Sequence, residues 1–183
     1  MEYRIKIGGI ERDLPICKLN DDLAIAAFVI FGDVELTQVC ASELLKKAPD
    51  FDYMLAPEAK AIPLIYEMAR QSGRNEYLLA RKNKKAYMKG VFSVSVNSIT
   101  TAGTQTLYMD AEDAAKMKGK RVLVIDDVIS TGESLRAVEE LVHQSGGIVC
   151  GRMAVLAEGD AAERDDIIFV EKLPLFNADG TVK

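Results

Sequence analysis

Residues 122–135 read Val-Leu-Val-Ile-Asp-Asp-Val-Ile-Ser-Thr-Gly-Glu-Ser-Leu, and this stretch decides the fold class. Its first four residues are apolar and β-forming, which predicts a strand buried on both faces. Asp126 and Asp127 follow where we expect the strand to leave the sheet, and a small Ser130-Thr131-Gly132 turn precedes a predicted helix over residues 133–144. This order is typical of an α/β protein, in which ligands bind at the carboxyl ends of the strands.

The turn after the predicted strand has the composition of a phosphate-binding loop. Successive backbone N–H groups and two hydroxyls can surround an anion at a helix start. Asp126 and Asp127 would repel phosphate, and they suit sugar hydroxyls or a hydrated Mg²⁺. A phosphorylated ribose meets both demands. A plain turn in which an aspartate caps the helix explains one acid, but not two acids followed by Ser-Thr-Gly.

This segment resembles the signature of the type I phosphoribosyltransferases, which bind 5-phosphoribosyl diphosphate (PRPP). In that family two acids contact the ribose hydroxyls, directly or through Mg²⁺, and the next loop holds the 5′-phosphate. The resemblance implies the catalytic role for Asp126 and Asp127, with any metal held only through water. It implies substrate binding for the residues that follow, namely Val128, Ile129, Ser130, Thr131, Gly132, Glu133 and Ser134.

The whole chain fits one domain, residues 1–183, of ordinary globular composition. Strands and helices alternate, which predicts an α/β fold with a mainly parallel sheet flanked by helices. The resemblance implies the type I phosphoribosyltransferase fold, with a core over about 50–158 and a small hood from about 1–32 and 159–183. The predicted strands are 3–7, 51–56, 77–80, 122–125, 149–156 and 167–170, the helices are 33–47, 62–72 and 133–144, and a two-stranded excursion covers 91–96 and 104–109.

Composition excludes several other classes of protein. The net charge of −5 argues against a nucleic-acid surface. The three cysteines, Cys17, Cys40 and Cys150, lack the spacing of a disulfide framework or a zinc site. The N-terminus lacks the apolar region of a signal peptide, and the most apolar run, residues 23–31, is too short to span a bilayer. We therefore expect a soluble cytoplasmic protein without a membrane partner.

Two further segments match the family in the correct chain order. Residues 56–63 resemble the turn of the adenine and xanthine enzymes that contacts the diphosphate, which implies this role for Glu58, Ala59 and Lys60. Residues 81–89 hold five of the 23 basic residues and resemble the start of the mobile loop of those enzymes. Arg81, Lys82 and Lys85 would then bind the diphosphate, and could do so across a dimer interface, with Lys85 as a catalytic cation. Taken alone, the first segment is better explained by a plain turn and the second by a solvated charged loop.

The purine base is the less specific part of the resemblance. Leu19 and Asn20 resemble the base-contacting stretch of the xanthine enzymes, although Asn20 also suits a turn. Residues 155–160 lack the lysine that 6-oxopurine enzymes carry, which favours adenine. The mobile loop, with its tip at residues 97–103, has Thr100 and Thr101 in place of the glutamate of many adenine enzymes. This departure argues against adenine as the base.

The resemblance as a whole implies a homodimeric purine phosphoribosyltransferase. It would use Mg²⁺, PRPP and a purine base, with adenine favoured. Xanthine, guanine or hypoxanthine as the base is the nearest alternative. A non-catalytic regulator that senses PRPP is the more distant one, since the known repressors of this type add a DNA-binding module, for which an acidic chain of 183 residues leaves no room.

Overall fold

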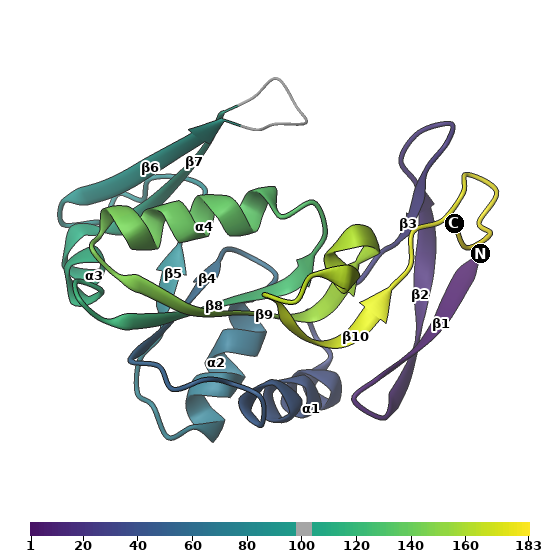
Figure 1. Ribbon diagram of the computed structural model, residues 1–183, viewed down its shortest axis with the longest axis horizontal. Helices are drawn as coiled ribbons and strands as arrows, with labels where there is room; N and C mark the ends of the chain where they lie inside the picture. The colour runs from purple at the N-terminus through teal and green to yellow at the C-terminus, as the bar shows by residue number, and fades with distance from the viewer. Residues whose placement is uncertain (98–103) are drawn as a thin grey trace.

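A five-stranded parallel sheet forms the centre of the molecule. The computed structural model describes residues 1–97 and 104–183. The sheet has the order β10-β9-β8-β4-β5, and every neighbouring pair in it is parallel (Figure 1). The carboxyl ends of all five strands therefore lie at the same edge of the sheet, and the turns that follow the strands meet there. Its strands are β4 (Tyr53–Pro57), β5 (Leu78–Ala80), β8 (Arg121–Ile129), β9 (Ile148–Glu158) and β10 (Ile168–Leu173).

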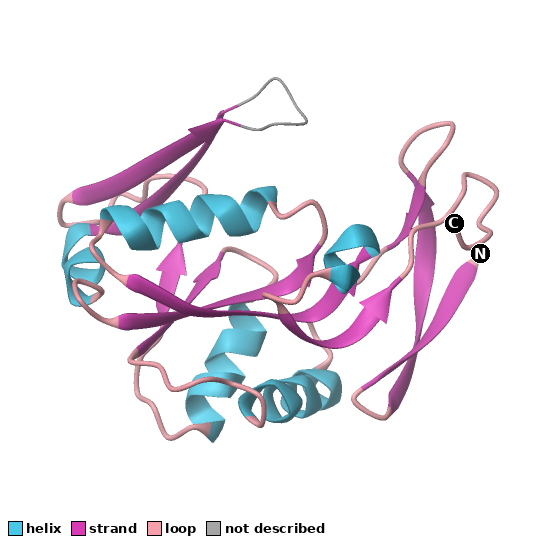
Figure 2. Ribbon diagram, viewed as in Figure 1, coloured by secondary structure: helices cyan, strands magenta, loops and turns pink. Residues whose placement is uncertain are grey.

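Helices cover both faces of this sheet, as Figure 2 shows, and the predicted fold class is confirmed. Helices α1 (Val34–Leu45) and α2 (Ile62–Gln71) lie on one face. The other face carries α4 (Glu133–Gln144), α3 (Ala111–Lys116) and the antiparallel hairpin of β6 (Val91–Asn97) and β7 (Thr104–Asp110). Burial of β8 on both sides explains why its sequence is almost continuously apolar up to the acids.

Local sequence signals explain how the helices begin and which faces they bury. The Asp33 side chain accepts the Leu36 amide at 3.1 Å and caps α1. Helix α4 buries Leu135, Val138 and Leu141, which recur at helical spacing and turn one stripe toward the sheet. The opposite side of α4 is charged, so the helix lies on the sheet in one orientation only.

A separate three-stranded antiparallel sheet lies beside the core, within residues 1–32, one of the two segments that the resemblance assigns to a hood, and we keep that name for it. It consists of β1 (Glu2–Ile7), β2 (Ile10–Lys18) and β3 (Ala24–Ala26). The C-terminal segment reaches it, because Phe176 pairs with Ala24 and its ring packs edge-on against Tyr3. Strand β10, which falls within the range predicted for the hood, pairs with β9 in the central sheet instead.

Several local details differ from the sequence predictions. Strand β8 does not end at the acids but continues through Ile129, so that Val128 and Ile129 pair with Leu156 and Ala157 of β9. The pattern did not predict β2, β3, α3 or the short 3₁₀ helix η1 (Gly159–Glu163). No helix within residues 1–97 and 104–183 is long and apolar enough to cross a membrane.

Candidate functional site

The acidic pair lies inside β8, near its carboxyl end. Asp126 and Asp127 are 8% and 5% exposed, which is unusual for charged side chains. The Asp127 amide donates to Asp126 Oδ1 at 2.8 Å, so the first carboxylate is held by the backbone of the second. Burial, followed by the charge of Asp127, raises the pKa of Asp126 from 3.8 to about 8.

Lys60 is the cation that faces this pair. Its Nζ lies 3.0 Å from Asp127 Oδ2, and it also opposes the rise in the pKa of Asp126. Asp127 Oδ2 is buried and has this ion pair but no hydrogen bond of good geometry. Because Lys60 belongs to the turn between β4 and α2, the ion pair joins two of the three segments predicted to bind ligand. Lys60 is half exposed, and the contact can therefore exchange with solvent or ligand.

The predicted phosphate cradle begins helix α4. Gly132 is the N-cap residue and has a φ of +79°, a left-handed conformation that favours glycine. The Glu133 amide lies 3.5 Å from Thr131 Oγ1, and the Arg136 amide donates to the Gly132 carbonyl to open the helix. A helix start of this kind presents N–H groups and the positive end of the helix dipole to an anion. The structure thus gives residues 130–134 the geometry expected of a phosphate-binding turn.

Glu158 adds a third buried carboxylate at this edge. It ends β9 and is 8% exposed. Burial raises its pKa, while a hydrogen bond from the Ser130 side chain and the charge of Lys60 oppose that rise. Ile129 pairs with Ala157 in the sheet, so that Ser130 and Glu158 are the next residues along two adjacent strands. Glu158 therefore connects the cradle to the strand that follows α4.

Arg164 lies against the other side of the Gly132 turn. A Cβ atom on Gly132 would come within 3.0 Å of Arg164 Nη1. The remaining nitrogens of the guanidinium donate to both carboxylate oxygens of Asp166 at 2.8 Å, which fixes its orientation. A cation thus stands beside the turn that is expected to receive a phosphate.

Glu58 organises the basic segment. It accepts the Lys82 amide at 2.7 Å and Arg81 Nη1 at 3.2 Å, and its carboxylate lies 3.9 Å from Lys85 Nζ. Burial disfavours its charged form, but the bonds from Lys82 and Arg81 outweigh this effect and lower its pKa. The Glu58–Ala59 peptide bond is cis. An ionised Glu58 does not attract a diphosphate, and its contacts instead hold Arg81, Lys82 and Lys85 beside the turn.

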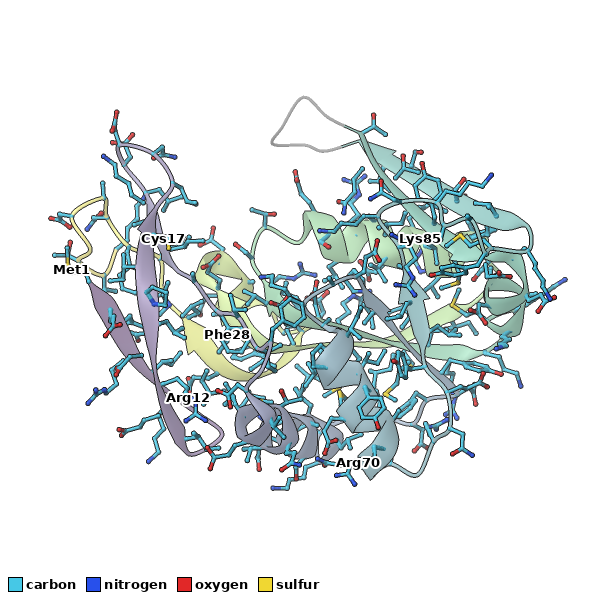
Figure 3. The ribbon with its side chains drawn as sticks, turned by 180° about the vertical axis from the view of Figure 1, so that it is seen from behind. Met1, Arg12, Cys17, Phe28, Arg70 and Lys85 are labelled. Carbon is cyan, nitrogen blue, oxygen red and sulfur yellow. The ribbon has the colours of Figure 1, made fainter. Side chains whose placement is uncertain are left out.

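The basic segment is also anchored to the hairpin on the other face. The backbone of Arg81 exchanges hydrogen bonds with Tyr108 of β7, at 2.7 and 2.8 Å. In Figure 3 Lys85 lies on the core side of the molecule, whereas Cys17 of the hood lies at its opposite end and Phe28 between them. The predicted loop tip, with Thr100 and Thr101, falls outside the residues that the structure describes.

Leu19 and Asn20 lie apart from this cluster. They form the turn between β2 and β3, where Leu19 is exposed and Asn20 Oδ1 accepts the Asp22 amide at 2.9 Å. The side-chain oxygen of Asn20 therefore serves the turn, and only its NH₂ group is left for a ligand. The structure brings the acidic pair, the cradle, Lys60, Glu58 and the basic segment together, and leaves these two residues on the hood.

Sequence reasoning missed two residues of this site. The signal that indicated Asp126 was an acid directly after a run of apolar residues. Glu158 has the same signal, and it lies at the same edge of the sheet. No pattern indicated Arg164, because η1 folds the chain back to the cradle through tertiary contacts. Within residues 1–97 and 104–183, no three His, Cys, Asp or Glu side chains form a ready metal site.

Comparison with known proteins agrees with this geometry. The family model described as "Phosphoribosyl transferase domain" matches residues 40–178. An adenine phosphoribosyltransferase of Brachyspira hyodysenteriae is 32% identical over 93% of this chain and 88% of its own. One from Kosmotoga olearia is 32% identical over 65% of this chain and 68% of its own. The crystal structure of the Thermoanaerobacter pseudethanolicus adenine enzyme has a TM-score of 0.64 at 24% identity, over 78% of this chain and 84% of that one, which shows a shared fold.

Proposed function

The chain belongs to the phosphoribosyltransferase family, in its purine branch, and from this premise we propose that it transfers the phosphoribosyl group of PRPP to adenine. The products would be AMP and diphosphate. One observation carries the proposal: a buried acidic pair lies shortly before a helix start that begins at a left-handed glycine, Lys60 faces the pair from a second loop, and Glu58 of that loop holds the basic segment beside it. This combination suits a ligand that has sugar hydroxyls between two phosphate groups.

The reaction is a substitution at the anomeric carbon of the ribose. A ring nitrogen of the base forms a bond to this carbon, and the bond to the diphosphate oxygen breaks. Positive charge grows on the ribose ring while negative charge grows on the leaving group, so a fixed array of charges is the useful catalyst. Asp126 and Asp127 would accept the ribose hydroxyls and stabilise the positive ring. Lys60, Arg81, Lys82 and Lys85 would stabilise the departing diphosphate.

The residues present suit Mg²⁺ that arrives with the substrate. Asp127 Oδ2 is a buried acceptor, and its one partner among the described residues is the exchangeable cation of Lys60. The described residues offer no set of three ligands, so the protein would hold the ion through the acidic pair and water while the diphosphate supplies other oxygens. When bound, Mg²⁺ would neutralise charge on the diphosphate.

Adenine is favoured by the residue that follows β9. Gly159 has a φ of +58°, and a Cβ atom there would lie 2.9 Å from Leu175 Cδ1. A lysine that donates to a 6-oxo group therefore has no room at this position unless Leu175 moves. We retain Leu19 and Asn20 as proposed base contacts, which would require the β2–β3 turn to approach the site. A homodimer and a cytoplasmic location also remain proposals.

The test is a panel of bases with Mg²⁺-PRPP. Adenine, hypoxanthine, guanine and xanthine would be supplied separately, and nucleotide and diphosphate would be quantified by chromatography. We expect equimolar AMP and diphosphate, with a higher kcat/KM for adenine than for the other three. A higher value for guanine or xanthine would overturn the assignment of the base. PRPP binding without turnover of any purine would instead support a PRPP-sensing regulator.

A further inference from the structure

The proposed reaction requires a proton acceptor, and this inference rests on the proposed function. A neutral purine carries a hydrogen on its ring nitrogens, and the nucleotide product has lost that hydrogen. A proton must therefore leave the base as the bond to ribose forms. General bases contribute about 10²- to 10⁴-fold to such steps when they are positioned within hydrogen-bond reach.

The acids of β8 have other tasks. Asp127 is ion-paired to Lys60 at 3.0 Å, and Asp126 Oδ1 accepts the Asp127 amide. Both are needed on the ribose side of the site. His143 is the only histidine, and it lies exposed in the last turn of α4, at the opposite end of the helix from the cradle. Glu58 holds the basic segment through Arg81 and Lys82.

Glu158 is a buried carboxylate without such a task. It lies at the end of β9, one position beyond the residue that pairs with Ile129. Ser130 occupies the corresponding position after β8, and its side chain lowers the pKa of Glu158, so the hydroxyl is placed to donate to this carboxylate. Ser130 is also the first residue of the phosphate cradle, so its oxygen borders the space where the ribose ligand would lie. The two side chains thus form a path from the ligand side of the turn to a buried acid.

The charges around Glu158 also suit proton uptake. Lys60, on the β4–α2 turn, is the cation that faces it, and Asp126 and Asp127 on the neighbouring strand share that cation. Burial raises the pKa of Glu158 above its ordinary range, which makes the carboxylate a stronger proton acceptor than an exposed glutamate. Glu158 is only 8% exposed, so a proton from the ligand would reach its carboxylate through Ser130.

We propose that Ser130 and Glu158 form a proton relay for the attacking purine. As the ring nitrogen forms its bond to the anomeric carbon, its proton passes to the Ser130 oxygen. The Ser130 hydroxyl proton passes at the same time to Glu158. The electron pair of the breaking bond leaves with the diphosphate. Glu158 ends the step protonated and releases its proton to solvent after the products depart.

The principal test is Glu158→Gln, which keeps the shape of the side chain and an acceptor for the Ser130 hydroxyl but cannot take up a proton. We expect kcat to fall by about 10²-fold or more, while the Kd of Mg²⁺-PRPP stays within about two-fold. In the wild type, kcat at saturating PRPP should fall as the pH drops through the raised pKa of Glu158. That contribution to the acidic limb should be absent from the variant.

A second purine base distinguishes a proton relay from a structural role of Glu158. The ring N–H of 8-azaadenine is more acidic than that of adenine, because an additional ring nitrogen withdraws charge. A relay predicts that Glu158→Gln loses less activity with 8-azaadenine than with adenine. A residue that merely supports the turn would impair both bases equally.

Two further variants complete the experiment. Ser130→Ala interrupts the relay from the side of the turn, and adding Glu158→Gln to it should lower kcat no further. It also tests the relay independently if the buried glutamine unfolds the protein. The matched control is Glu163→Gln, which removes a carboxylate in η1 that is 77% exposed and pairs with Lys172. This control should leave kcat unchanged.

The outcomes separate this inference from the proposed function. An active wild type whose Glu158→Gln variant keeps kcat within about two-fold would overturn the relay alone. A variant that loses PRPP affinity in proportion to kcat would also overturn it, because Glu158 would then only support the cradle. A wild type that turns over no purine would overturn both.

Discussion

Replacing Gly132 by alanine tests the phosphate cradle with the smallest possible change. Gly132 has a φ of +79°, and the added methyl group would lie 3.0 Å from Arg164 Nη1. The substitution therefore strains the backbone at the helix start and crowds the cation beside it. Both effects fall on the N–H groups that we expect to hold the 5′-phosphate.

The two costs can be separated in magnitude. A side chain in the left-handed region costs roughly 1–2 kcal/mol of folding free energy wherever it occurs. Loss of one preorganised donor to a reacting anion costs about 10²-fold in rate. Gly119→Ala is the matched control, since Gly119 has a φ of +69° and no atom lies within 4 Å of its added methyl group. It bears the backbone cost without any contact to the cradle.

The assay combines urea unfolding with steady-state kinetics on both variants. We expect similar losses of unfolding free energy, about 1–2 kcal/mol each. We expect kcat/KM for PRPP to fall by about 10²-fold in Gly132→Ala and to stay within about two-fold of wild type in Gly119→Ala. Equal kcat/KM values in the two variants would contradict the assignment of the 5′-phosphate to this turn and place its site elsewhere.

Two other predictions concern charge. Lys85→Ala should lower kcat more than it weakens PRPP binding, because the diphosphate gains charge as it leaves. The control is the adjacent, exposed Lys84, whose replacement by alanine should have no effect in the same kinetic assay. Burial and Asp127 raise the pKa of Asp126 from 3.8 to about 8, so its bound proton stabilises the ligand-free fold at low pH. The unfolding free energy should therefore decline as the pH rises between these values, and urea titrations should show a weaker decline for Asp126→Asn.

The centre of the fold and of the site could be predicted because their signals are local. The apolar run of β8 and the Ser-Thr-Gly turn lie within one strand and one helix start, where propensity and glycine chemistry act over a few residues. Asp126 and Asp127 followed from the same stretch. The left-handed Gly132 confirms that the turn requires glycine for a backbone reason.

Other parts depend on contacts between distant segments. Strand β3 has only three residues, and its pairing with β2 and with Phe176 joins distant segments, which no local pattern contains. The contacts of Glu58 could not be predicted for the same reason, because its partners lie 23 and 24 residues further along the chain. Lys60 was predicted to bind diphosphate, but its ion pair with Asp127 required the β4–β8 neighbourhood in three dimensions.

The most direct measurement of the central claim is calorimetric binding of Mg²⁺-PRPP to the wild type and to the double variant Asp126→Asn/Asp127→Asn. Our account predicts that binding is lost in the double variant, because the ribose hydroxyls and the cation lose their acceptors. A site that attracted PRPP by charge alone would bind this variant more tightly, since the negative charge of the acidic pair is removed. Undiminished or stronger affinity would therefore contradict the assignment of PRPP to Asp126–Ser134.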